Sequence, residues 1–204
     1  MKIGFFAQGE GPHLDIAQKL IDSAKVVMPG VEIYQLTDDK TPALATPIRA
    51  TGNMPMGVRR LVHYSQLPGD WLFVDTDIVF QKDVRDVFDK PFDVAVASRD
   101  DTYMVRTHKE YTHIMPHNFG VVFSRNVFVW RTLIPQLLQL NDKIQRWGGE
   151  QFLLGRMASD NKLFNFHILP SSYNYPPEEE GEDLSHAHIV HFKGKRKHFK
   201  ECTT

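Results

Sequence analysis

Two aspartates spaced two residues apart, Asp75 and Asp77, directly follow an apolar, β-prone run, Trp71–Val74. Such a run is typical of a strand buried on both faces, as at the centre of a mostly parallel sheet. In an extended segment, side chains two residues apart project to the same side. Two carboxylates aimed at one place repel each other, and hard divalent cations prefer oxygen ligands. The pair therefore indicates a divalent metal site, or alternatively one aspartate that caps the next turn beside one that is solvated.

A second group of chemically suited residues lies near the end of the chain, in residues 191–197, His-Phe-Lys-Gly-Lys-Arg-Lys. His191 can supply a nitrogen ligand beside two carboxylates, a mixed set that suits Mn²⁺. Gly194 lets the backbone approach an anion, and Lys197 offers a point charge for phosphate. Taken alone, the segment is better explained as a basic tail with a chance histidine, or as a weak nucleic-acid patch.

The elements that must position these residues alternate between strands and helices. Strands are predicted at 2–7, 31–36, 71–74, 92–98, 119–124 and 188–192, with an extended segment at 163–169. Helices are predicted at 14–27, 56–67, 127–140 and 150–158, and loops at 41–55, between 98 and 117, and at 176–183. This alternation predicts one α/β domain over residues 1–204, a mainly parallel sheet flanked by helices. Ligands of such sheets bind beyond the carboxyl ends of strands, where Asp75 and Asp77 lie.

Composition narrows the classes of function. With 204 residues, 42% of them hydrophobic, the chain can bury one substantial core. Its net charge of −1 gives no global reason to expect a nucleic-acid partner. Cys202 is the only cysteine, which rules out an intramolecular disulfide. There is no signal-peptide pattern, and no apolar run approaches the roughly 18–20 residues that span a bilayer. These features predict a soluble, cytoplasmic protein.

Four motifs occur in a definite order: Asp75-Thr76-Asp77, Asn118-Phe119-Gly120, Gly149-Glu150-Gln151, and His191-x-x-Gly194-x-x-Lys197. In this order they resemble those of the nucleotide-sugar-dependent GT-A glycosyltransferases of family 8, the glycogenin and bacterial lipopolysaccharide galactosyltransferase type. The resemblance runs from the first predicted strand to about Lys197. It implies a GT-A, Rossmann-like nucleotide-diphospho-sugar transferase fold. It also implies a metal-dependent, retaining transferase that moves a hexose from a nucleotide-diphosphate sugar, with UDP-sugar the usual donor, to an acceptor that stays open.

The resemblance implies a role for the residues of each motif. Asp75, Asp77 and His191 would bind Mn²⁺ or Mg²⁺ on the donor's diphosphate, which Gly194 and Lys197 would also contact. Asn118, Glu150 and Gln151 would lie beside the transferred sugar and its anomeric carbon. The remaining donor-binding residues would be Gly4, Phe5, Phe6, Ala7, Gln8, Thr76, and Arg59 or Arg60.

Three departures from the family pattern concern the sugar and acceptor side. Phe119 replaces a serine, Glu150 stands where aspartate is usual, and His198-Phe199 replaces Pro-Trp. No carboxylate is obviously placed as a covalent nucleophile, and Gln151 would be a poor one. We therefore expect an internal-return path through an ion pair. In it the acceptor attacks the anomeric carbon on the same face from which the diphosphate leaves.

Two other functions stay open at this point. Asp75-Thr76-Asp77-Ile78-Val79 also fits the strand-end signature of haloacid-dehalogenase-like phosphatases, in which the first aspartate is the nucleophile. That family usually has this strand at its N-terminus, and Asp100-Asp101 is only a thin candidate for the later acidic pair it needs. The other alternative is a non-catalytic domain that binds a nucleotide-sugar or a glycan, for which Phe119 is the only hint.

Overall fold

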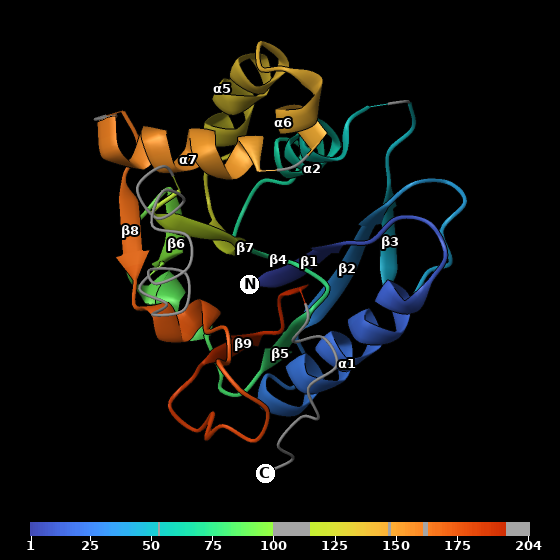
Figure 1. Cartoon of the computed structure of the whole chain (residues 1–204), viewed down its shortest axis with the longest axis vertical. Coiled ribbons are helices and arrows are strands. Elements are labelled where there is room, and N and C mark those ends of the chain that lie inside the picture. Colours follow the sequence, from blue (N-terminus) through green and yellow to red (C-terminus); the bar gives the residue numbers. More distant parts are fainter. Residues whose placement is uncertain (53, 100–114, 147, 161–162, 195–204) are drawn as a thin grey trace.

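The computed structural model describes residues 1–52, 54–99, 115–146, 148–160 and 163–194. Its central sheet has seven strands in the order β3-β2-β1-β4-β7-β6-β8 (Figure 1). The strands are β1 (Lys2–Phe6), β2 (Glu32–Thr37), β3 (Thr46–Arg49), β4 (Trp71–Val74), β6 (Val94–Ser98), β7 (His117–Ser124) and β8 (Phe166–Leu169). Four neighbouring pairs are parallel, while β7 runs antiparallel to both β4 and β6. The predicted α/β architecture with a mostly parallel sheet is confirmed.

Helices cover both faces of this sheet. Helix α1 (Pro12–Val27) packs on one face, and α2 (Met56–Tyr64), α5 (Val127–Leu138) and α7 (Gly149–Asp160) pack on the other (Figure 1). The remaining helical elements are α6 (Asp142–Arg146) and the 3₁₀ turns η1 (Arg85–Asp89) and η2 (Ser171–Asn174). Within the described residues, no helix combines the length and apolar character needed to cross a membrane.

The central strand β4 is buried on both faces, as its apolar sequence predicts. Leu72 and Val74 belong to the core on the α1 side, whereas Trp71 and Phe73 belong to the core beneath α2 and α5. The Tyr64 ring of α2 stacks on the Phe73 ring at a centroid distance of 3.7 Å. A strand packed in this way is held rigidly, so the residues that follow its carboxyl end start from a fixed position.

A second, two-stranded sheet brings the end of the chain to this position. Strand β5 (Ile78–Phe80) pairs antiparallel with β9 (Ile189–His191), and Ile78 lies opposite His191. The backbone N–H of Phe192 donates to the Asp77 carbonyl at 2.8 Å, which extends the pairing by one bond. The pairing therefore places His191 beside Asp77.

One loop prediction is wrong. Strand β3 lies inside the stretch 41–55, which its Pro, Thr and Gly content marked as a loop. Pro47 is compatible with β3 because β3 is an edge strand with a single neighbour, β2, so a missing backbone donor can face away from the sheet. The predicted loop at 176–183 is confirmed, and most of the predicted loop before His117 lies outside the described residues.

His63 of α2 should make folding stability pH-dependent. Its side chain is 2% exposed, and burial, together with the charge of Arg59, lowers the pKa of His63 to about 4. The unfolded chain, with an ordinary histidine pKa near 6.5, then binds the proton more readily, so stability present above pH 6.5 is lost as the pH falls towards 4. Urea unfolding at pH 7.0 and pH 4.5 should show about 2 kcal/mol less acid destabilisation in His63→Leu than in the wild type. Equal losses in both proteins would contradict the buried, neutral imidazole.

Candidate metal and donor site

Three ligand-type side chains converge beyond the carboxyl end of β4. The Nε2 atom of His191 lies 3.1 Å from Asp77 Oδ1 and 3.7 Å from Asp75 Oδ2, and one ligand atom from each residue lies within 4.8 Å of the others. His191 and Asp77 are buried, and Asp75 is half-buried. Two carboxylates and an imidazole nitrogen that share so small a space form a mixed oxygen and nitrogen donor set. These residues therefore fit a divalent cation.

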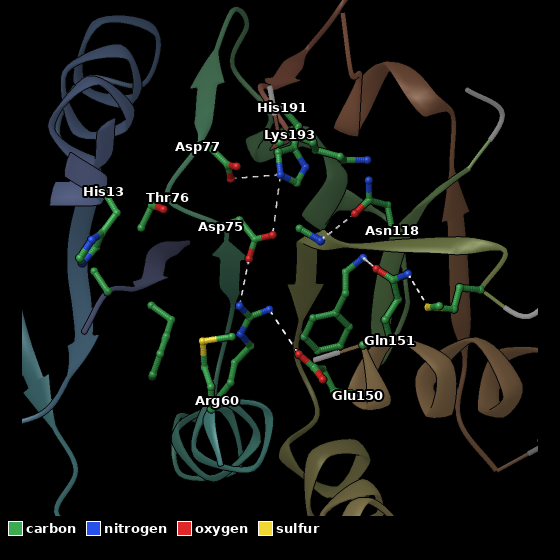
Figure 2. A pocket seen from close by; sticks show the side chains of 18 of the residues that line it. His13, Arg60, Asp75, Thr76, Asp77, Asn118, Glu150, Gln151, His191 and Lys193 are labelled. Carbon is green, nitrogen blue, oxygen red and sulfur yellow. Dashed lines mark hydrogen bonds and ion pairs between the residues drawn. The ribbon is translucent and has the colours of Figure 1, made fainter. Parts of the chain in front are cut away.

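Arg60 of α2 connects this group to a buried glutamate. Its guanidinium lies 3.2 Å from Asp75 Oδ1 and 3.7 Å from Glu150 Oε1. Figure 2 shows the resulting series of contacts, which runs from Asp77 through His191 and Asp75 to Arg60 and Glu150. Burial raises the pKa of Glu150, and the charge of Arg60 offsets part of that shift. Because Arg60 holds Asp75 by Oδ1, the Oδ2 atom of Asp75 stays directed towards His191.

Strand β7 and helix α7 form the cavity wall beside Asp75. The Gln151 side chain, in the first turn of α7, accepts from the Phe119 N–H at 3.2 Å and lies with its Nε2 3.0 Å from Met115 Sδ. The Asn118 side chain accepts from the Gly120 N–H at 3.0 Å. These bonds hold Asn118 and Gln151 at the surface of the same cavity (Figure 2).

Gly120 has no side chain, and the His191 ring occupies the space that a side chain there would need. A Cβ atom at Gly120 would lie 2.2 Å from His191 Cε1 and 3.0 Å from Asp75 Oδ2. The Asp75 N–H also donates to the Gly120 carbonyl at 2.9 Å, so β7 holds the aspartate backbone as well. The glycine of the Asn118-Phe119-Gly120 motif is therefore required by packing against His191 and Asp75.

Most of the predicted site residues line one cavity of about 870 Å³. They are Phe6, Ala7, Gln8, Arg60, Asp75, Thr76, Asp77, Asn118, Glu150, Gln151, His191 and Gly194. Gly4 and Phe5 do not line it, because both are buried within β1, and only Phe6 at the end of that strand reaches the cavity. Arg59 is not in the wall either, since its guanidinium donates to the Gly52 carbonyl. Lys197, Asp100 and Asp101 lie outside the described residues.

Other residues of the site had no clear motif in the sequence. The cavity is also lined by His13, Met56, Arg99, Met115, Gly148 and Lys193. His13 follows the glycine loop of Gly9 and Gly11, which is the signal that could have drawn attention to it. Asn174, just behind the wall, has its Oδ1 2.8 Å from His191 Nδ1. Nothing in the local sequence Ser-Tyr-Asn-Tyr indicates this contact, because it depends on the pairing of the segment at Tyr175 with β9.

The sequence matches no known family profile and no curated protein. Its structure, in contrast, resembles solved glycosyltransferases. An active-site mutant of LgtC is 15% identical over 95% of this chain and 88% of that chain, with a TM-score of 0.62. GlyE of Streptococcus pneumoniae TIGR4 is 14% identical with a TM-score of 0.65, and the similarity covers 95% of this chain but 55% of GlyE. A glycosyltransferase involved in glycosylating the major capsid of PBCV-1 is 13% identical, covers 97% of both chains and has a TM-score of 0.61. The chain thus has the GT-A fold.

Proposed function

We propose that this chain is a metal-dependent, retaining glycosyltransferase of the family 8 type. It would transfer a hexose from a UDP-sugar to the hydroxyl of an acceptor. One observation carries the proposal: Asp75, Asp77 and His191 come together from distant parts of the chain, at the carboxyl end of β4, in the same cavity as Glu150 and Gln151. The GT-A fold and the order of the four motifs support it.

The diphosphate end of the donor would lie against Asp75, Asp77 and His191. A divalent cation bound there supplies Lewis-acid stabilisation of the negative charge that develops on the departing diphosphate. Gly194 lines the same cavity with a φ of 58°, a left-handed conformation that favours glycine and lets the backbone turn at the wall. Lys197, three residues further along the chain, would add a second positive charge to the leaving group.

The sugar end of the donor would lie between Asn118, Glu150 and Gln151. The charge of Arg60 beside Glu150 Oε1 weakens this carboxylate as a nucleophile, and Gln151 is a neutral amide that accepts from the Phe119 N–H. This arrangement supports the ion-pair-like path with internal return. Mass spectrometry of the denatured protein after rapid quenching of a donor reaction should find no glycosyl adduct. An adduct on Glu150 or Asp75 would replace this path with double displacement.

The direct test of activity is donor cleavage. The protein would be incubated with Mn²⁺ and a panel of UDP- and GDP-sugars, and the release of nucleoside diphosphate would be followed by mass spectrometry. We expect slow hydrolysis of one UDP-sugar even without acceptor, and its loss on addition of EDTA. Release of inorganic phosphate from phosphate esters, without donor cleavage, would instead support the haloacid-dehalogenase alternative. Donor binding without turnover would support a non-catalytic domain.

Two adjacent arginines offer a matched pair of variants. Arg60→Lys keeps a positive charge but cannot hold Asp75 and Glu150 together, since an ammonium group lacks the fork of a guanidinium. Because Arg60 orients a metal ligand, we expect about tenfold slower donor cleavage at a fixed Mn²⁺ concentration. Arg59→Lys loses only the contact with Gly52 and should cleave the donor at the wild-type rate. If Arg59→Lys slowed donor cleavage and Arg60→Lys did not, then Arg59, and not Arg60, would be the arginine that acts at the donor site.

A further inference from the structure

We propose that Asn174 is a positioning residue that sets which nitrogen of His191 faces the two aspartates. The proposal rests on the metal site of the proposed function and adds a residue to it. Asn174 is 2% exposed and His191 is 3% exposed, so bulk water has little access to the contact between the two side chains. The Oδ1 atom of Asn174 lies 2.8 Å from His191 Nδ1. Among the described residues, this is the side-chain hydrogen bond that the structure gives for Nδ1.

The orientation of the Asn174 amide follows from its other contact. Its Nδ2 atom donates to the backbone carbonyl of Asn118 at 3.4 Å. A carbonyl oxygen only accepts, so the NH₂ group must face β7 and the Oδ1 atom must face the imidazole. Oδ1 is likewise an acceptor only. In the neutral imidazole the proton therefore resides on Nδ1, and the lone pair resides on Nε2.

This tautomer keeps the space between the ligands open. With its proton on Nδ1, His191 directs the Nε2 lone pair at Asp77 Oδ1 and Asp75 Oδ2, 3.1 Å and 3.7 Å away. Three electron-pair donors then face one point, an arrangement that a cation satisfies. In the opposite tautomer, Nε2–H would donate directly to Asp77 and occupy the ligand position. By holding the proton on Nδ1, Asn174 disfavours a direct hydrogen bond from His191 Nε2–H to Asp77, which would exclude the cation.

The surrounding backbone holds the two residues in this relation. The His191 N–H donates to the carbonyl of Tyr175 at 2.8 Å, and the Tyr175 N–H donates to the Ile189 carbonyl at 2.9 Å. The segment that carries Asn174 is therefore paired with β9 itself. Gly120 lies directly against the Cε1 and Nδ1 atoms of the His191 ring. The imidazole cannot turn away without losing its contact with Asn174.

The test combines the tautomer with metal affinity. Long-range ¹H–¹⁵N spectra of the protein loaded with diamagnetic Zn²⁺, with His191→Gln to assign the signals, should show the proton on Nδ1 and none on Nε2. Asn174→Leu should bind Mn²⁺ about 10–100-fold more weakly by calorimetry, as expected when the outer partner of a ligating histidine is removed. Asn174→Asp keeps an acceptor for Nδ1–H. It should retain the wild-type tautomer and bind Mn²⁺ more tightly than Asn174→Leu does.

Asn126→Ala is the matched control. The Asn126 amide also makes two hydrogen bonds, to Asp93 and to the Phe128 N–H, but it caps α5 and does not line the cavity. This variant should lower Tm without changing Mn²⁺ affinity. A folded Asn174→Leu protein with affinity within twofold of the wild type, or wild-type His191 with its proton on Nε2, would overturn the proposal. If Asn174→Leu does not fold, the proposal is tested by the tautomer of His191 in the wild type and in Asn174→Asp. A proton on Nε2 in either protein would overturn it. Mn²⁺ binding without donor cleavage would refute the transferase but leave Asn174 in its role.

Discussion

Asp77→Asn should abolish metal-dependent donor cleavage, with a loss of about 10³-fold in rate. The substitution keeps the size of the side chain and removes the negative charge of the ligand closest to His191, whose Nε2 lies 3.1 Å from Asp77 Oδ1. A neutral amide can present its NH₂ group to the cation, and it no longer balances the positive charge. Calorimetry should show Mn²⁺ affinity falling with activity, since both depend on the same ligand.

Asp70→Asn is the matched control for this change. Asp70 precedes the other end of β4 and forms an ion pair with Arg125 at 2.9 Å. It does not line the cavity, so its variant should bind Mn²⁺ and cleave the donor as the wild type does. If Asp77→Asn kept wild-type affinity and rate, the assignment of Asp77 as a metal ligand would be wrong.

Gly120→Ala should disrupt the same site through packing alone. The added methyl group would lie 2.2 Å from His191 Cε1 and 2.6 Å from Nδ1, closer than carbon and nitrogen atoms can approach. The imidazole or β7 must shift, and a displacement of about 1 Å at a reacting centre can cost about 10²-fold in rate. The overpacked core should also lose about 1–3 kcal/mol of unfolding free energy. Urea unfolding and donor cleavage measure these two effects separately.

Gly155→Ala is the corresponding control in α7. There the nearest atom to an added Cβ is Pro116 Cδ at 3.1 Å, and the position is helical. A small adjustment accommodates this methyl group, and alanine favours the helix, so donor cleavage should stay at the wild-type rate. Gly120→Ala at full activity would show that His191 does not lie against Gly120 during donor cleavage.

The sequence predicted the parts of the fold that have strong local patterns. β4 is recognisable because every residue from Trp71 to Val74 is apolar, and a strand between two helical layers has this composition. Its carboxyl end then locates Asp75 and Asp77. The amphipathic spacing of Leu20, Ile21 and Ala24 likewise predicted α1, which buries these residues against the sheet.

The remaining parts depend on contacts between distant segments. β5 has three residues, too few for a period to show. β9 lies within the predicted strand 188–192, but its pairing with β5 depends on the fold. His191 could be assigned as a ligand only from the order of the motifs. Asn174 was beyond prediction, because its partners, His191 and Asn118, approach it only after both sheets have formed.

The most direct test of the central claim is crystallographic. Crystals grown with Mn²⁺ and UDP would be measured at a wavelength where manganese scatters anomalously. We predict a single strong anomalous peak between Asp75 Oδ2, Asp77 Oδ1 and His191 Nε2, about 2.0–2.3 Å from each ligand atom, with the UDP diphosphate in its remaining coordination positions. A diphosphate bound in the cavity without manganese at these three atoms, or manganese bound elsewhere, would contradict the account.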